Sequence, residues 1–412
     1  MTTTPSPLFF SDDLLTEILS LLPVKSLLRF KCVSNPWKTL ISDPNFVKFH
    51  FKKLKSRNPQ HFTLITEYPD NDYSIIPYPI PRILDNPSFT LVADPHFLLS
   101  QKDCSRLVGS CNGLVCLVGD RYAYGSGLAS CYEYWFRLWN PATRKTSQKI
   151  GCFCDSGIFV FDFGCDNSTE TFKVVASRYL GVGEELTTDV RVFSLGDNVW
   201  RNIESFPVVP LYCDVEQFHH TGVFLNGTLN WLAIQDEDPI THYCDLEWNN
   251  IKVEQIVIVS LDLGTETYNQ YRLPWGFDEV PSAEPSFGVL GDCLCFSYCY
   301  RKTDFIIWQM KEFGVEESWT QFLKISYHDL QLNYDSGFGT LQKILEPLFL
   351  SNDGDTLSRS FEERESIIYN WRDHRVERTG VTVHKTSIDD GNKGRVWWSF
   401  AKGFVESLIS IS

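Results

Sequence analysis

The first 55 residues combine short apolar stretches at helical spacing with clear helix-breaking signals. The apolar residues between positions 14 and 22 fill an arc of roughly 160° on a helical wheel. Packing against one neighbouring element requires an apolar stripe of only about 100°. Ser11 is a suitable N-cap, and two aspartates follow it where a helix favours negative charge. The pattern predicts a helix with more apolar surface than its own neighbours need, formed by Leu14, Leu15, Ile18, Leu19, Leu21 and Leu22.

Three further helices are predicted before residue 56. Pro23 ends the first helix and opens a second that carries Val24, Leu27, Leu28 and Cys32. Ser34 caps a short third helix with Trp37, Leu40 and Ile41, and Asp43-Pro44 starts a fourth. So small a unit is near the limit of independent stability. It therefore reads as a docking module for a second protein, or as a cluster that packs only on the rest of this chain.

Beyond Asn58-Pro59-Gln60 the apolar period shifts towards two, and turn residues recur. A strand–turn unit is repeated five times, with starts 54, 67, 49 and 61 residues apart, a spacing that suits propeller blades. The copies are Leu138–Pro141, Val192–Leu195, Val259–Asp262, Trp308–Lys311 and Tyr369–Arg372. The strands before three of them, Gly113–Val118, Leu229–Ala233 and Leu294–Tyr298, are predicted to be inner strands.

The last segment, Val396–Ile411, alternates but contains no sixth full unit. The isolated strand His61–Thr66 could complete its sheet and remove an exposed edge. We therefore expect a small all-α cluster (residues 5–57) followed by an all-β, kelch-like propeller of about six blades (residues 60–412), with the last blade closed by strands from both ends. A pair of β-sandwiches is the alternative.

Composition and charge narrow the function. The chain has 412 residues, 14% aromatic residues and a net charge of −15. Residues 1–58 carry 9 Lys/Arg and 4 Asp/Glu, or +5, so the remainder carries −20. Such a balance argues against a general nucleic-acid binder. The 13 cysteines, an odd number, and the absence of a long apolar run predict no membrane span and a reducing compartment, the cytoplasm or the nucleus.

Candidate chemistry is sparse. Cys152-x-Cys154 and Cys293-x-Cys295-x-x-x-Cys299 are read as ordinary strand cysteines, because no matched CxxC pairs occur. His219-His220 and His242-x-Cys244 are equally weak. We expect no metal, no cofactor and no catalytic residue. Tyr122 and Trp275 stand beside glycines in predicted loops, where exposed aromatic residues would make good protein contacts.

The run from Leu14 to Phe46, with Leu22-Pro23-Val24-Lys25-Ser26-Leu27-Leu28 at its centre, closely resembles the F-box of plant F-box-associated proteins. The resemblance implies binding to Skp1, an acidic adaptor, in keeping with the local positive charge. Ser11 and Pro36 depart from the usual pattern but remove no apolar contact. The implied Skp1-binding residues are Leu14, Leu15, Ile18, Leu19, Leu22, Pro23, Val24, Leu27, Leu28, Val33, Trp37, Leu40 and Ile41.

The remainder resembles the F-box-associated interaction domain. Its landmarks include Gly109–Cys116, Trp139–Arg144, Gly227–Leu232 and Asp262–Glu266. The resemblance implies a substrate-recognition subunit of a Skp1–cullin–F-box ubiquitin ligase, which captures an unknown protein substrate and is not itself an enzyme. The residues that would bind substrate are unknown. A protein-binding scaffold without ligase function and a propeller hydrolase with convergent carboxylates remain as alternatives.

Overall fold

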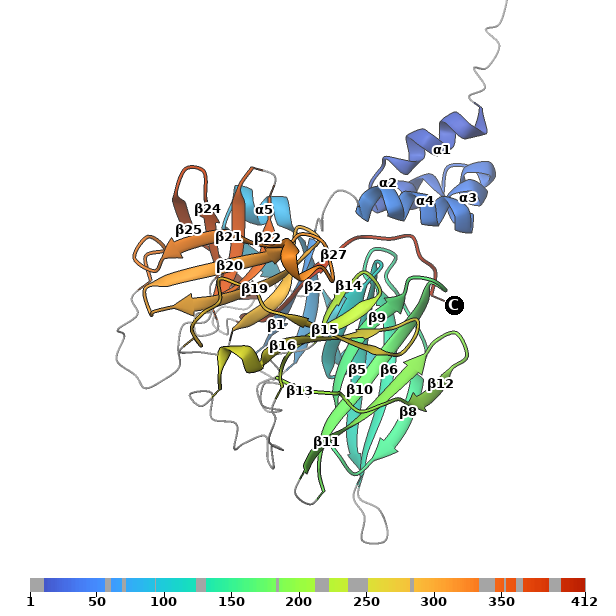
Figure 1. Ribbon diagram of the computed structural model, residues 1–412. Helices are drawn as coiled ribbons and strands as arrows, with labels where there is room; N and C mark the ends of the chain where they lie inside the picture. The colour runs from blue at the N-terminus through green and yellow to red at the C-terminus, as the bar shows by residue number, and fades with distance from the viewer. Residues whose placement is uncertain are drawn as a thin grey trace, which may run out of the picture.

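Four short helices form the first unit of the computed structural model (Figure 1). They are α1 (Asp12–Ser20), α2 (Val24–Phe30), α3 (Asn35–Ser42) and α4 (Pro44–Lys55). The predicted caps are confirmed, because the Ser11 hydroxyl accepts the Leu14 N–H at 3.3 Å and the Ser34 hydroxyl accepts the Trp37 N–H at 3.4 Å. Pro36 lies in the first turn of α3, where its missing N–H removes no helical hydrogen bond.

The structure describes most of the chain, with gaps between the ranges that follow. These are residues 11–55, 61–68, 72–92, 94–123, 131–182, 185–211, 222–235, 251–281, 285–332, 345–351, 353–360, 366–384 and 394–411.

Six antiparallel sheets follow the helices. We number them as blades from the sheet that begins with β4, so that the sheet formed by both ends of the domain is the last. Blade 1 contains β4 (Arg106–Cys111), β5 (Leu114–Ala123), β6 (Cys131–Asn140), β7 (Lys145–Thr146) and β8 (Ile150–Asp155). Blade 2 contains β9 (Val160–Asp166), β10 (Thr171–Val182), β11 (Glu185–Ser194) and β12 (Val199–Asn202). Blade 3 contains β13 (Val209–Pro210), β14 (Val223–Leu225), β15 (Thr228–Ile234), β16 (Ile256–Asp262) and β17 (Tyr268–Arg272).

The remaining blades complete the ring. Blade 4 contains β18 (Ser286–Leu290), β19 (Cys293–Tyr300), β20 (Asp304–Met310) and β21 (Trp319–Ser326). Blade 5 contains β22 (Leu345–Leu350), β23 (Asp355–Ser360), β24 (Ser366–Asn370) and β25 (Arg375–Arg378). Blade 6 contains β27 (Arg395–Phe404), β1 (His61–Glu67) and β2 (Tyr73–Pro79). Beside it lie α5 (Ile80–Asp85) and a parallel pair, β3 (Ser88–Val92) with β26 (Gly380–His384).

The predicted closure of the ring from both ends is confirmed. Strand β1 pairs antiparallel with β27, from His61 opposite Phe404 to Glu67 opposite Arg395. This pairing gives six blades and excludes the pair of β-sandwiches. Among the described residues, no helix is both long enough and apolar enough to cross a bilayer.

The five repeated units fall at the ends of β6, β11, β16, β20 and β24, each of which is the third strand in the hydrogen-bonded order of its sheet. The expected inner strands were wrong, however. Adjacent blades touch through their first strands, such as β4 with β9 and β18 with β22. The segments predicted as inner are the second strands β5, β15 and β19. Their strong hydrophobicity reflects burial on both faces of a blade, which alternation alone does not locate.

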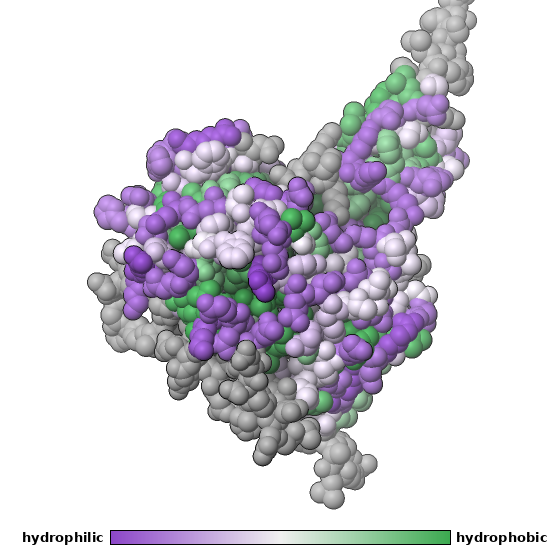
Figure 2. Space-filling model, viewed as in Figure 1, coloured by the Kyte–Doolittle hydropathy of each residue, from purple (hydrophilic) through white to green (hydrophobic). Residues whose placement is uncertain are grey.

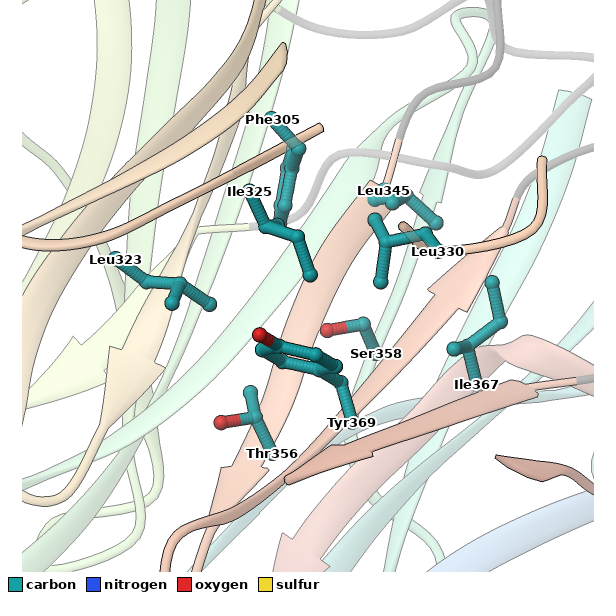
Figure 3. Close-up of a pocket in the computed structure, with 9 residues that line it drawn as sticks. All are labelled: Phe305, Leu323, Ile325, Leu330, Leu345, Thr356, Ser358, Ile367 and Tyr369. Atoms are coloured by element: carbon teal, nitrogen blue, oxygen red, sulfur yellow. The ribbon is translucent and has the colours of Figure 1, made fainter. Parts of the chain in front are cut away.

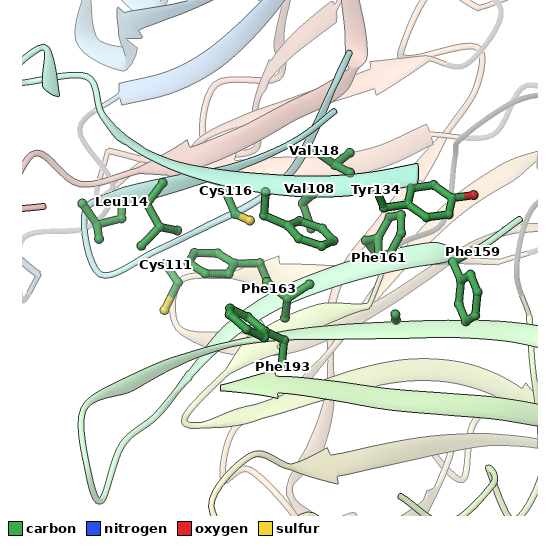
Figure 4. Packing of buried hydrophobic residues seen from close by; sticks show 14 of the residues in the cluster. Val108, Cys111, Leu114, Cys116, Val118, Tyr134, Phe159, Phe161, Phe163 and Phe193 are labelled. Carbon is green, nitrogen blue, oxygen red and sulfur yellow. The ribbon is translucent and has the colours of Figure 1, made fainter. Parts of the chain in front are cut away.

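Hydrophobic side chains fill the spaces between blades. Between blades 1 and 2, the buried rings of Tyr134 and Phe161 pack edge to face, with centroids 5.1 Å apart (Figure 4). The Phe136 ring packs edge to face on Phe161 in the same way, at 5.0 Å. Between blades 2 and 3 the approach is closer, since a Cβ on Gly164 would lie 2.5 Å from Leu263 Cδ1. Rigid contacts of this kind present the loops at each end of the ring as fixed surfaces.

Candidate functional site

The outer side of α1 carries an uncovered apolar stripe. Leu14 and Ile18 are each 46% exposed, and Leu21, which caps the helix, is 50% exposed. The three residues are four and three positions apart, so they lie on one side of the helix. Figure 2 shows hydrophobic side chains gathered on the part of the cluster farthest from the propeller. The surplus apolar surface expected from the sequence is therefore present and open to solvent.

The thirteen residues expected to bind Skp1 divide into three groups. Val33 (66% exposed) and Pro23 join Leu14 and Ile18 on the surface. Four others form the core of the cluster and are fully or almost fully buried: Leu19, Val24, Leu27 and Ile41. The remaining five are half-buried: Leu15, Leu22, Leu28, Trp37 and Leu40. Direct contact with a partner is open to the first group, while the core group holds the helices in place.

Polar contacts tie α1 to α4. The Lys53 ammonium donates to Glu17 at 2.5 Å and to the Ser20 hydroxyl at 3.0 Å. The buried His50 ring donates through Nε2 to the Leu22 carbonyl at 2.8 Å. These bonds fix the helix that bears the apolar stripe, so the stripe is presented in one orientation.

The exposed rim of the cluster is basic. Lys25, Arg29, Lys38, Lys48 and Lys52 are all exposed. Burial, and then the nearby ammonium of Lys145 in blade 1, lowers the pKa of Lys31. A basic rim around an apolar stripe favours an acidic partner.

The helical cluster also contacts the propeller. Lys48 of α4 forms an ion pair with Glu170, in the turn between β9 and β10. Leu408, which follows β27, is 5% exposed and lies within the apolar core of the cluster. Val405 and Ala142 pack against the same core. The cluster thus docks on the rest of its own chain, as one of the two sequence interpretations proposed, and still leaves the stripe on α1 free.

A second exposed feature is Trp275, with 88% of its surface accessible. It lies in the loop from β17 to β18, that is, from the last strand of blade 3 to the first of blade 4. Because strands alternate in direction within a blade, this loop lies on the opposite face of the ring from the β9–β10 turn that contacts the helices. The neighbouring Phe277 is buried, which anchors the loop. Tyr122 was also predicted to lie in a loop, but it lies near the end of strand β5, opposite Tyr132 of β6, and is 43% exposed.

The candidate metal ligands of the sequence form no metal site among the described residues. No group of three or more His, Cys, Asp or Glu side chains among them could hold a metal ion. Cys295 and Cys299 are buried in β19, whereas His219, His220, His242 and Cys244 lie outside the described ranges. A small cavity lies between blades 4 and 5 (Figure 3). The volume within which the centre of a water molecule can move is about 10 Å³. That is room for roughly one water and far below the size of a metabolite pocket.

Two functional contacts were missed at the sequence level. Leu408 belongs to the helical core, although almost the whole length of the chain separates it from Leu19 in the sequence. Gly113 and Asn140 were noted only as landmarks, yet both contact the segment that contains Leu408. The sequence placed both residues in turn motifs, but these motifs did not indicate which distant segment the turns would contact.

Comparison with known proteins agrees with this arrangement. Residues 83–411 match the family described as the F-box associated beta propeller domain, and residues 8–49 match the F-box domain. An F-box/kelch-repeat protein of Arabidopsis thaliana is 30% identical over 76% of this chain and 78% of its own length. The Arabidopsis thaliana F-box protein CPR1 is 24% identical over 76% of this chain and 72% of its own length.

Proposed function

This chain belongs to the plant F-box proteins with an F-box associated β-propeller domain, and from that membership we propose that it is the substrate-recognition subunit of a Skp1–cullin–F-box ubiquitin ligase. In this role the helical cluster binds a Skp1-type adaptor, and through it the cullin. The propeller holds a protein substrate. The chain is an adaptor and not an enzyme, and it acts by raising the local concentration of substrate near the ubiquitin-loaded enzyme.

The observation that carries the proposal is the uncovered stripe of Leu14, Ile18 and Leu21 within the segment that matches the F-box. Each side chain is about half exposed, so covering it would stabilise a complex by roughly 1 kcal/mol before the cost of association. Val33 adds a fourth exposed aliphatic contact. The surrounding lysines and arginine complement an acidic adaptor.

The double variant Leu14→Asp/Ile18→Asp tests the adaptor-binding surface. Two carboxylates on the stripe would have to be desolvated in the complex, so we expect binding to a purified Skp1-type adaptor to fall by at least 100-fold in isothermal titration calorimetry. Because both side chains face outwards, the helical content measured by circular dichroism should not change. Charges at the half-buried Leu15 or Leu28 would disturb the cluster as well as the surface.

The matched control is Ile158→Asp. Ile158 is also 46% exposed but lies between β8 and β9 of the propeller, so this variant should bind the adaptor as tightly as the parent protein. Unchanged adaptor binding by Leu14→Asp/Ile18→Asp would overturn the assignment. Loss of binding by Ile158→Asp alone would place the adaptor on the propeller instead.

We further propose Trp275 as a contact for the protein substrate. It lies on the face of the ring away from the helical cluster, where a bound protein would not collide with the adaptor. An exposed tryptophan on an anchored loop supplies a large contact area at little entropic cost. We expect Trp275→Ala to lose proteins that co-purify with the parent chain from plant extract while adaptor binding persists.

Ubiquitination of the bound proteins distinguishes a ligase subunit from a protein-binding scaffold without ligase function. In cells, proteins captured by the propeller should carry ubiquitin when the stripe on α1 is intact and lose it in Leu14→Asp/Ile18→Asp. Bound proteins that are equally ubiquitinated, or equally unmodified, with both forms would favour a scaffold without ligase function.

A further inference from the structure

The segment after β27, residues 405–411, runs between the helical cluster and the propeller (Figure 1). We name it the C-terminal strap. Its Leu408 side chain is 5% exposed and shares a core with Leu19, Leu27 and Phe46 of the helices. Val405, at the start of the strap, packs against the same core. The strap therefore supplies side chains that complete the interior of the helical unit.

The same strap is hydrogen-bonded to blade 1. The Asn140 side-chain amide donates to the carbonyls of Ser407 and Ile409 at 3.1 and 2.9 Å. The Ser407 hydroxyl, which is fully buried, donates to the Gly113 carbonyl at 3.3 Å. Asn140 is itself fully buried, so its amide donors have exchanged water for these two carbonyls and, at 3.5 Å, for the Ser407 hydroxyl.

Gly113 shows how closely the strap lies on the propeller. Its φ of +76° favours glycine, and a Cβ built on it would lie 2.3 Å from the Cβ of Ser407. Farther along the strap, Ile409 and Ile411 pack against the core between blades 1 and 2. Leu408 thus points into the helices while its neighbours on both sides, Ser407 and Ile409, are held by the propeller.

Charged groups lie along the same junction. Glu406 of the strap is 3.9 Å from His61 Nε2 at the start of β1. Burial raises the pKa of Glu406, and the nearby Lys25 of α2 opposes that shift. The ion pair between Lys48 and Glu170 adds a direct contact between helix and propeller, but both side chains are largely exposed. Exposed pairs contribute little, so the buried contacts of the strap contribute more to the junction than this ion pair does.

We infer that the C-terminal strap fixes the orientation of the helical cluster on the propeller, with Leu408 and Asn140 as the positioning residues. Leu408 packs into the core of the helical cluster, and Asn140 donates hydrogen bonds to the backbone carbonyls on either side of Leu408. The geometric claim is independent of any partner. Its consequence rests on the proposed function: the strap sets the direction in which a captured substrate is held relative to the bound adaptor.

Asn140→Asp tests this inference without touching the helices. In the parent protein, Asn140 Oδ1 accepts the backbone N–H groups of Ala142 and Thr143 at 3.0 and 3.2 Å. An aspartate keeps that acceptor, but at pH 8 it has no donor for the carbonyls of Ser407 and Ile409. We expect the strap to detach and the helical cluster to lose its fixed orientation.

The measurement is the distance distribution between spin labels on the full-length chain, by pulsed electron paramagnetic resonance. Non-natural amino acids at the exposed positions Lys38 and Glu317 carry the labels, so the native cysteines stay in place. We expect one narrow distribution for the parent protein and a width at least twice as large for Asn140→Asp.

Two controls match the test variant. Asn370 occupies the equivalent turn of blade 5, where its Oδ1 accepts the N–H groups of Arg372 and Asp373, but its amide donates to Asp353 and Asp355 rather than to the strap. Asn370→Asp should therefore keep the narrow distribution. Ser410→Asp places the same charge on an exposed position of the strap itself and should also leave the distribution narrow.

Leu408→Asp provides the second variant. It should broaden the same distribution, and it reports on the helical end of the strap if Asn140→Asp destabilises blade 1. A narrow distribution for both Asn140→Asp and Leu408→Asp would overturn the inference, as would equal broadening by Asn370→Asp. Adaptor binding, measured in parallel, should survive in Asn140→Asp because the stripe on α1 is unchanged. A parent protein that fails to bind the adaptor would refute the proposed function and leave the result for the strap intact.

Discussion

At the residue scale, Asp162 is an ionisable residue whose carboxyl group is buried inside the propeller. It lies on β9 and is 1% exposed. Burial raises its pKa to about 7, against the hydrogen bonds that it accepts from the Gly222 N–H and the Trp231 indole, and against Lys402. Asp166, on the same strand, behaves differently: hydrogen bonds from Thr169 and Ser168 outweigh burial and lower its pKa to about 2.

The two pKa values predict opposite pH dependences. The unfolded value is about 3.9, so as the pH rises from about 4 to about 7 the unfolded chain loses the proton of residue 162 before the folded one does. The free energy of unfolding should therefore fall over that range because of Asp162. Between pH 5 and pH 8, the free energy of unfolding measured with denaturant should fall in the parent protein by roughly 2–3 kcal/mol more than it falls in Asp162→Asn.

Asp166→Asn is the control for this measurement. The stabilisation from Asp166 is present above pH 4 and is lost only as the pH falls towards 2, so this variant should keep the parent slope between pH 5 and pH 8. An unchanged slope in Asp162→Asn would show that Asp162 ionises in the folded protein much as it does in the unfolded chain.

Side chains whose neighbours are local were predictable at this scale. The caps Ser11, Ser34 and Asp43 act within three residues along the chain, and the sequence located all three. The division of the apolar arc of α1 into an inner and an outer stripe was not predictable. Distant segments such as the strap determine which side of a helix is covered, and the spacing of leucines along the helix does not indicate where those segments pack.

At the element scale, helix α4 depends on its cap. The Asp43 carboxylate accepts the N–H groups of Asn45 and Phe46 at 2.8 and 3.2 Å. Asp43→Ala should lower the local stability of α4 by about 1 kcal/mol, which corresponds to roughly five-fold faster amide hydrogen exchange in the helix. Asp43→Asn keeps an acceptor and should exchange at nearly the parent rate. Equal exchange in the alanine variant would mean that packing alone holds the start of α4.

The strands show where pattern reading succeeds and where it fails. The repeated units marked the end of the third strand in five blades, because a turn of fixed geometry requires the same residue types each time. Asn140, Asp262 and Asn370 each accept backbone N–H groups in these turns. The order of strands within a blade was misjudged, because β5, β15 and β19 owe their apolar character to burial between blades rather than to a position at the axis.

At the scale of the whole molecule, the ring depends on the pairing of β1 with β27. A chain truncated before residue 394 would leave β1 as an open edge, so we expect it to aggregate and the amides of β1 to lose protection from hydrogen exchange. A chain truncated after residue 404 keeps β27 and should retain a folded propeller. Normal protection of β1 in the shorter chain would show that the ring closes without β27.

The contact between Leu408 and the helices has a consequence for synthesis. The ribosome completes α4 about 350 residues before it adds Leu408, an interval of roughly 20–70 s at ordinary elongation rates. Throughout that time the nascent helical module must remain soluble without the side chain that completes its interior. An adaptor or a chaperone that arrives during translation therefore meets a looser target than the mature protein presents.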